Sequence, residues 1–432
     1  MADAVAADGA GQVIARKRHV LAAVLGNALE FYDFVTYSFF ALQIGHAFFP
    51  TKDPFVGLML SLGTFGAGFL TRPIGGFVLG AFTDRVGRRA SMMLSYILMG
   101  SAITALALIP PYAEIGLWAP VLALLARMVQ GFSLGGEVGS IMAFLTEAAP
   151  PRRRGLIVAW QGASQLIAAS TGALVGLILS QAMTPGALDA YGWRIAFLLG
   201  AFTVPLGLVL RRALPETLHA PETSPSPAAS GGGSLRVIVL GVMVLGGGTI
   251  ATYVLNYMTT FAETSLHLGA RVAFLATMLP NLLAIPAALL GGLLSDRIGR
   301  RPVMIWGQTA FVLAILPVFF LMVREPTGVG LVAGGCLLAI INVFGFNAFY
   351  VAFSESLPKF MRGRAVGAVY ACAIAAFGGS TQAVIAWLIH ATGRPEAPGV
   401  YMFVGALSSL TGMWLMLESA PVRQAALAPT PA

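Results

Sequence analysis

The sequence predicts an all-α membrane protein with twelve transmembrane helices in two six-helix halves. Its 432 residues are 57% hydrophobic and only 10% charged, with a mean hydropathy of +0.82. A soluble globular protein is about one quarter charged. Two loop motifs each occur twice, once in each half of the chain. The composition therefore predicts helices that span a membrane, and the repeats predict how these helices are grouped.

Twelve stretches are apolar over the length that an α-helix needs to cross the hydrocarbon core, about 20 residues. They are residues 19–46, 55–82, 90–111, 116–148, 155–181, 192–211, 235–263, 271–294, 302–323, 329–354, 363–391 and 399–418. The longer stretches are expected to tilt or to extend beyond the lipid.

Basic residues alternate between the two sides of the predicted helices. The net charge is +8, and 19 of the 26 Lys and Arg residues fall in alternate loops and in the two tails. The opposite loops hold only Lys52, Arg194, Arg271, Arg324 and Arg394. The positive-inside rule therefore places both termini in the cytoplasm, which agrees with an even number of spans. Because the basic excess marks topology, no nucleic-acid partner is expected.

The remaining segments are polar. Residues 1–18 lack the hydrophobic region and cleavage site of a signal peptide and are expected to be a cytoplasmic tail. Residues 212–234 are rich in Pro, Ser, Ala and Gly, which is typical of a flexible linker. They would join the halves 19–211 and 235–418, and residues 419–432 would form a second cytoplasmic tail.

The halves repeat each other. GAFTDRVGRR (80–89) ends the second stretch and GGLLSDRIGRR (291–301) ends the eighth. TEAAPPRRRG (146–155) follows the fourth stretch and SESLPKFMRG (354–363) follows the tenth. Both pairs are separated by nearly the same number of residues, so an internal duplication is inferred. Two parallel repeats of six spans are typical of one architecture of secondary transporters.

The G-x-x-x-D-R-x-G-R-R loop resembles the signature loop of the major facilitator superfamily. The runs LEFYDF, RPIGG, DRVGRR, RMVQGFSLGGEVG and YGWRIAFLLG together resemble its metabolite:proton symporter branch. IGLWAPVLALLARMVQGFS, followed by AWQGASQ, is similar to bacterial citrate and tricarballylate proton symporters. The resemblance implies the major facilitator fold, the bacterial inner membrane, a functional monomer, and uptake of a small carboxylate with protons by alternating access.

Two arginines, Arg72 and Arg127, lie inside hydrophobic stretches where almost no other basic residue occurs. A guanidinium in lipid is costly, so such residues face the bundle interior or a watery cavity. Their planar donor fork matches a carboxylate. Pro73 weakens the helix beside Arg72 and frees backbone groups there. The pair predicts a site for an anionic solute; the alternative for Arg72 is a structural pair with Glu30 or Asp33.

Glu30 and Asp33 are three residues apart and share one stripe of the first helix. Desolvation and mutual repulsion favour the protonated form of at least one carboxyl, as a proton-coupled carrier requires. Both are candidates for proton coupling, and the alternative is a structural pair with a buried arginine. Glu137 follows Arg127 by about 15 Å along the fourth helix. It is a candidate for a gating or structural partner, or for the proton site.

Neutral polar residues in the predicted helices complete the expected substrate site. Any one of them can instead be a hydrogen bond between helices. The candidates are Asn27, Gln130, Gln161, Gln165, Tyr253 and Asn347. The second half has no charged residue well away from a helix boundary, so charge is expected to act in the first half and neutral contacts in the second.

The duplicated loop has a role that the resemblance implies: its aspartate contacts a neighbouring helix end and holds the cytoplasmic side shut. Favourable placement of an anion at a helix N-terminus makes this role physically reasonable. The candidate gating residues are Asp84 and Arg88 in the first copy, and Asp296 and Arg300 in the second.

These patterns favour a proton-coupled transporter that imports citrate or a related tricarboxylate. Alternatives are a symporter for a dicarboxylate, 2-oxoglutarate, shikimate or a betaine-like zwitterion, and the arginine pair favours a multivalent anion. No H-E-x-x-H, G-x-S-x-G or metal-ligand cluster is present, and the two cysteines, Cys336 and Cys372, have no metal spacing. An enzyme, a cofactor and a bound metal are therefore not expected. A sensor or scaffold is disfavoured because no extra soluble domain is apparent.

Overall fold

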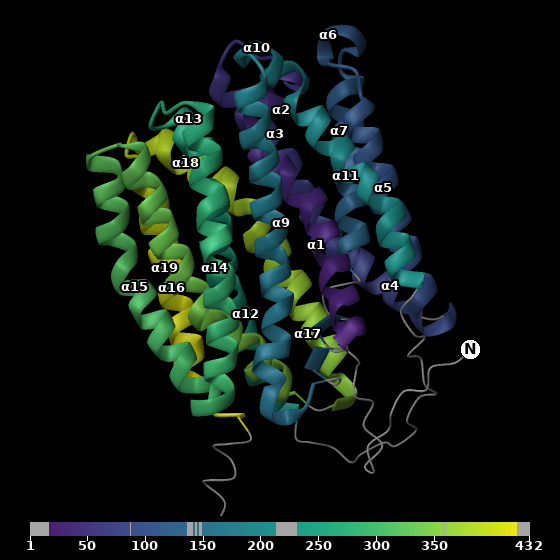
Figure 1. The fold of residues 1–432 in the computed structure, drawn as a ribbon, viewed down its shortest axis with the longest axis vertical. Coiled ribbons are helices and arrows are strands. Elements are labelled where there is room, and N and C mark those ends of the chain that lie inside the picture. Colours follow the sequence, from purple (N-terminus) through teal and green to yellow (C-terminus); the bar gives the residue numbers. More distant parts are fainter. Residues whose placement is uncertain are drawn as a thin grey trace, which may run out of the picture.

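The computed structural model describes residues 17–86, 88–135, 141–142, 145–146, 149–212, 231–357 and 359–420. These residues form a bundle of long helices that run roughly side by side along the long axis of the molecule (Figure 1). No strand occurs among them. The first residues of α1 and the junctions of α4 with α5 and of α14 with α15 lie at one end, called here the basic end, and the short helices α6, α10 and α13 lie at the opposite end.

The helices of the first half show the order that the hydrophobic stretches predict. They are α1 (Lys17–Phe39), α2 (Ala41–Phe48), α3 (Pro54–Leu70), α4 (Arg72–Val86), α5 (Arg88–Leu108), α6 (Tyr112–Ile115), α7 (Trp118–Leu134), α9 (Arg154–Ala182), α10 (Pro185–Ala187) and α11 (Trp193–Arg212). A 3-10 turn covers Pro151–Arg153 and a π-helical turn covers Leu188–Gly192.

The second half repeats this order. Its helices are α12 (Gly231–Asn256), α13 (Met258–Thr264), α14 (Ala270–Ile298), α15 (Arg300–Arg324), α16 (Gly328–Glu355), α17 (Lys359–Ala373), α18 (Gly379–Thr392) and α19 (Ala397–Leu415), with a π-helical turn at Ile374–Gly378.

Local chemistry explains several helix ends. The Asp53 side chain accepts a hydrogen bond from the amide of Phe55 at 2.9 Å and so caps α3, and Thr327 caps α16 in the same way. Gly299 separates α14 from α15 with a φ of 109°, a value that favours glycine.

Among the described residues, a single residue outside the helices interrupts three predicted stretches. α1 gives way to α2 at Phe40, α3 to α4 at Thr71, and α12 to α13 at Tyr257. The π-helical turn at Ile374–Gly378 interrupts a fourth stretch, 363–391. The interruption at Thr71 confirms the effect expected of Pro73, which stands in the first turn of α4, where a missing N–H is tolerated. Among the described residues, seven helices are long and apolar enough to cross a membrane, and Met93–Leu108 and Trp118–Leu134 are shorter apolar helices.

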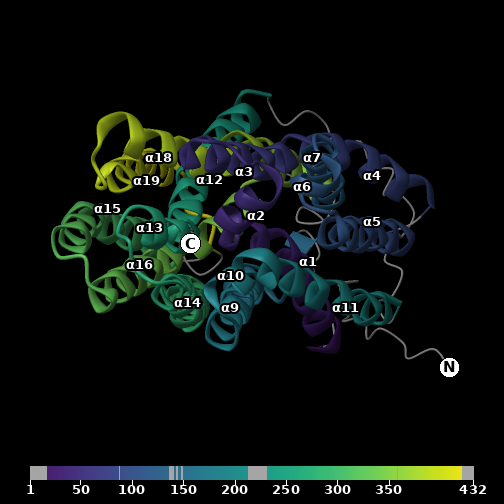
Figure 2. The same ribbon diagram turned by 90° about the horizontal axis from the view of Figure 1, so that it is seen from above.

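The two halves stand side by side. Viewed along the bundle, α5, α7 and α11 lie on one side and α15, α16 and α19 on the other (Figure 2). α9 and α14 form the most extensive helix pair and join the halves. A Cβ atom on Gly155 of α9 would meet the carbonyl oxygen of Gly292 on α14, so glycine allows the two backbones to touch.

Candidate functional site

Glycines bring the two predicted arginines together. A Cβ atom on Gly131 of α7 would collide with the carbonyl oxygen of Gly68, and one on Gly135 would collide with that of Arg72. The Thr71 hydroxyl also donates to the carbonyl of Met128 at 2.7 Å. The interruption between α3 and α4 therefore packs directly on α7, and Arg72 comes to lie beside the helix that carries Arg127.

Both arginines are buried, as expected, and they share one aromatic ring. Arg72 is 2% exposed and Arg127 is 0% exposed. The Cζ atom of Arg72 lies 4.3 Å from the centroid of the Phe34 ring, and that of Arg127 lies 4.4 Å from the same centroid. Two like charges thus meet over one ring on α1, and the electron-rich face of that ring attracts both.

Three further rings complete an aromatic cage, defined here as Phe34, Tyr37, Phe65 and Phe69. Phe69 lies 4.4 Å from Cζ of Arg72, whereas Tyr37 and Phe65 lie 4.6 and 4.9 Å from Cζ of Arg127. The rings attract both charges through their faces. They do not use the N–H donors, which lie in the plane of each guanidinium.

The donors of the arginines are largely unused. Nη1 of Arg127 donates to Oε1 of Gln130 at 2.5 Å and to the carbonyl of Phe34 at 3.5 Å. Among the described residues, Nε and Nη2 of both arginines have no hydrogen-bond partner. Within the described part of the chain, no carboxylate forms an ion pair with Arg72 or Arg127. Because a buried charge is costly unless it is paired and hydrogen-bonded, the arrangement suits an anionic ligand.

The carboxyls of α1 are also buried, at 0% exposure for Glu30 and 1% for Asp33. A Cβ atom on Gly200 would meet Oδ1 of Asp33, so this carboxyl points towards α11. Consecutive helical residues are turned by about 100°, and Phe34 therefore faces the arginines while Asp33 faces away. Among the described residues, no ion pair joins Asp33 to either arginine, so the alternative of such a structural pair is wrong. Glu137 lies outside the described residues.

Unsatisfied amides gather on α9 and α1. Within the part of the chain that the structure describes, neither amide atom of Gln161 has a hydrogen-bond partner. The same holds for Nε2 of Gln165 and Oδ1 of Asn27. Nδ2 of Asn27 donates to the Ser164 hydroxyl at 2.6 Å. Buried polar atoms are usually satisfied, so these atoms can receive a ligand or water.

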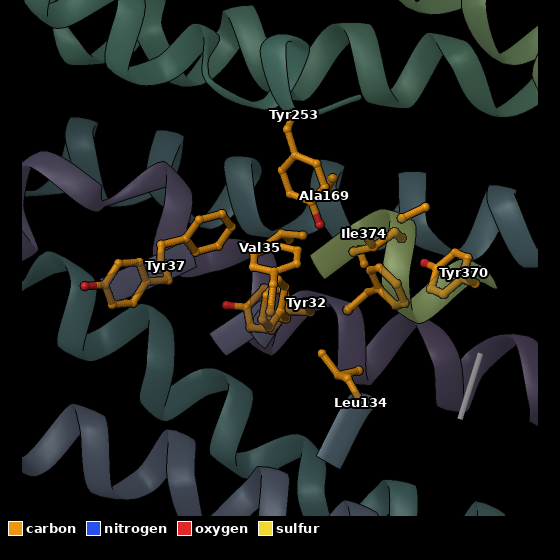
Figure 3. Packing of buried hydrophobic residues seen from close by; sticks show 14 of the residues in the cluster. Tyr32, Val35, Tyr37, Leu134, Ala169, Tyr253, Tyr370 and Ile374 are labelled. Atoms are coloured by element: carbon orange, nitrogen blue, oxygen red, sulfur yellow. The ribbon is translucent and has the colours of Figure 1, made fainter. Parts of the chain in front are cut away.

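The second half contributes Tyr253 and Asn347. Tyr253 of α12 meets Phe69 and Phe65 edge-on, with centroids 5.3 and 6.1 Å apart, so it reaches the aromatic cage. Figure 3 shows Tyr253 in the same buried cluster as Tyr37 and Tyr370. Oδ1 of Asn347 on α16 faces α9, because a Cβ atom on Gly162 would meet it.

The sequence patterns did not identify the rings of the cage as part of the site. Phe34 adjoins Asp33 in LEFYDF, and Phe65 and Phe69 are four residues apart on one helix face. Apolar residues in an apolar helix look alike whether they face lipid, core or a guanidinium, so only their contacts distinguish them.

At the basic end, Asp296 joins the halves. Its Oδ1 accepts from the amide of Gly155 at 2.8 Å and its Oδ2 accepts from that of Leu156 at 2.9 Å. An aspartate of α14 thus caps the N-terminus of α9, where exposed N–H groups favour an anion. Nη1 of Arg300 forms an ion pair with Oδ1 of the same carboxylate at 2.6 Å.

A second carboxylate extends this network. Glu355 accepts from Nη1 of Arg154 at 3.1 Å and from Nε of Arg300 at 3.3 Å. Arg300 is fully buried. The side chains of the other predicted gating residues, Asp84 and Arg88, lie outside those that the structure describes.

The halves also meet at the opposite end. Nε2 of Gln43 donates to Oε2 of Glu263 at 3.4 Å, and the rings of Phe55 and His390 stack with centroids 3.8 Å apart. A cavity of about 260 Å³ beside this stack is lined by residues of both halves, Tyr257 among them. The buried arginines therefore lie between two sets of contacts that join the halves.

Residues 23–373 and 242–430 match the model of the Major Facilitator Superfamily. The chain belongs to this superfamily. The predicted family is thereby confirmed, and with it a transporter rather than an enzyme.

Curated relatives cover nearly the whole chain. A citrate-proton symporter of Klebsiella pneumoniae is 36% identical over 406 residues, which are 92% of this chain and 90% of the relative. A proline/betaine transporter of Salmonella typhimurium is 32% identical over 431 residues, which are 94% of this chain and 84% of the relative. The xylose transporter XylE from E. coli, in a partially occluded inward open conformation, has the same fold, with a TM-score of 0.76, 17% identity, and coverage of 96% of this chain and 99% of that one.

Proposed function

We propose that this membrane protein is a proton-coupled symporter that imports citrate or a related tricarboxylate across the bacterial inner membrane. It would act as a monomer with twelve spans, two six-helix halves and cytoplasmic termini. The observation that carries the proposal is the pair of buried arginines with unused donors and no carboxylate partner in the described part of the chain. The similarity to citrate-proton symporters supports it.

The relatives that transport proline and betaine make a zwitterion the second candidate. An aromatic cage is a good site for a quaternary ammonium. Here, however, the guanidiniums of Arg72 and Arg127 already lie over the rings. A ligand cation would meet two positive charges, whereas a polycarboxylate would neutralise them, so the contacts favour the multivalent anion.

Alternating access would open the two ends in turn around the arginines. The contacts of Asp296 and Glu355 at the basic end would close the cytoplasmic side, and those of Gln43 and Phe55 would close the other. Asp33, which adjoins Phe34 in α1, is the proposed proton carrier, with Glu30 and Glu137 as alternatives. Protonation of Asp33 would shift α1 and with it the ring that holds both arginines.

Uptake of labelled citrate into proteoliposomes under an imposed pH gradient tests the proposed function. We expect accumulation that a protonophore abolishes, and competition by tricarballylate but not by glycine betaine. Uptake of betaine without any response to citrate would support the zwitterion instead.

Loss of the Asp296 charge should open the basic end. Asp296→Asn removes one of the two hydrogen bonds to the N-terminus of α9, because an amide nitrogen cannot accept, and it weakens the pair with Arg300. We therefore expect the inward-open population to rise about tenfold. A cysteine introduced at Ala159, where α9 meets α14, reports this by alkylation in a background without Cys336 and Cys372.

Asp189→Asn is the matched control, because Asp189 pairs with His46 at the opposite end. It should leave the alkylation rate unchanged. Equal labelling of the Asp296→Asn variant and the parent protein would contradict the proposed role of Asp296.

A further inference from the structure

Among the described residues, Phe34 is the one whose ring lies against the guanidiniums of both arginines of the site. It is 0% exposed and lies within 4.4 Å of the Cζ atoms of Arg72 and Arg127. We propose that Phe34 is a positioning residue that sets the separation of the two guanidiniums, and thereby makes the site selective for ligands with at least two carboxylates. This inference rests on the proposed function and names the group that determines its specificity.

An aromatic ring is suited to this task for an electrostatic reason. Two buried guanidiniums repel each other, and the repulsion grows as water is excluded. A carboxylate between them would neutralise the repulsion but would also accept the N–H donors that a substrate needs. The face of Phe34 attracts both cations through its quadrupole and leaves Nε and Nη2 of each arginine unused.

The ring is itself held in place. Phe69 meets it edge-on with centroids 4.8 Å apart, and Phe65 packs against it at 5.4 Å. Phe69 also contacts Arg72, and Phe65 also contacts Arg127, so the two guanidiniums and the three rings pack as one unit. Preorganised donors at a fixed separation bind a matching ligand without a further ordering cost.

Selectivity follows from that fixed separation. A ligand with two carboxylates on different carbons places one on each guanidinium, so it gains two charge-assisted contacts and neutralises both charges. A monocarboxylate meets only one arginine and leaves the other charge buried and unpaired, which is costly. If Phe34 no longer anchors the pair, the advantage of the polycarboxylate should shrink while weak binding of single carboxylates persists.

Fluorinated phenylalanines at position 34 test this idea without removing the ring. One, two and three fluorine atoms reduce the negative charge of the ring face stepwise with little change in shape. We expect the Kd of citrate, measured by titration calorimetry on the purified full-length protein, to rise with each fluorine and to reach about a tenfold increase with three. The Kd of acetate should change less, so the ratio between the two ligands should fall.

The same series at Phe48 is the matched control. Phe48 is also 0% exposed, but its ring packs edge-on against Trp193, with centroids 5.1 Å apart. Fluorination there should leave the Kd of citrate unchanged. As a second test, Phe34→Tyr should keep the selectivity for citrate over acetate, and Phe34→Leu should reduce it.

The experiments distinguish a failure of the proposed role of Phe34 from a failure of the proposed function. If trifluorination at position 34 leaves the citrate Kd unchanged while Arg127→Ala abolishes binding, the role of Phe34 is overturned and the proposed function stands. If the unmodified protein binds no polycarboxylate, the proposed function fails, and the inference fails with it.

Discussion

Arg127→Lys should weaken citrate binding by about ten- to a hundredfold, because charge-assisted hydrogen bonds contribute about 1.5–3 kcal/mol. The variant keeps the positive charge but loses the planar fork. It also loses the flat contact with Phe34 and Tyr37. Stabilisation by a fixed citrate concentration, measured as the shift in Tm, should shrink with the rise in Kd.

Arg194→Lys is the matched control for this prediction. Arg194 also lies over an aromatic ring, that of Trp193, and its Nη1 donates to the carbonyls of Ala107 and Ile109 at 2.7 Å each. None of these contacts of Arg194 in the described part of the chain involves a ring of the cage, so its replacement should leave the citrate Kd unchanged. Normal citrate binding in both Arg127→Lys and Arg72→Lys would remove the arginines from the site.

Replacing Arg127 by leucine separates function from stability. The leucine fills part of the space and removes one of two like charges that have no carboxylate partner among the described residues. We expect citrate binding to be lost while the Tm of the unliganded protein stays equal or rises, since exchange of a buried charge for an apolar group is often neutral or stabilising. A large drop in Tm would indicate that Arg127 is structural.

Asp33→Asn should abolish proton-driven accumulation. The amide resembles the protonated carboxyl, so the variant should still bind citrate and exchange it across the membrane. A gradient of one pH unit is worth about 1.4 kcal/mol for each proton, which is enough to accumulate citrate about tenfold. In the variant, citrate should reach only equal concentrations on the two sides of the membrane. Counterflow measures the exchange of citrate, and pH-driven uptake measures its accumulation. Both are measured in the same proteoliposomes.

Asp53→Asn provides the comparison for that experiment. Asp53 caps α3 at an exposed position, and asparagine caps helices about as well as aspartate, so both activities should persist. Full pH-driven accumulation in Asp33→Asn would exclude Asp33 and move the proton site to Glu30 or Glu137.

Much of the architecture follows from local features of the sequence. Long apolar stretches demand helices because a backbone without water must satisfy its own hydrogen bonds. Pro73 interrupts the second stretch where its ring and missing N–H predict an interruption. The burial of Arg72 and Arg127 follows from the cost of a charge in lipid, and the position of Asp296 at a helix N-terminus agrees with the predicted preference of an anion for that end.

The partners of these residues depend on the tertiary structure. Helical periodicity places Asp33 on a stripe with Glu30, but it does not say which helix that stripe faces. The packing of α1 turns Asp33 to Gly200 of α11 and Phe34 to the arginines, so rings surround the guanidiniums where a carboxylate was the expected alternative. The distinction arises because periodicity is a property of one helix, whereas the neighbour that each face meets depends on how the other helices pack around it. Glycines let α3, α4 and α7 approach closely, and this brings both arginines to Phe34.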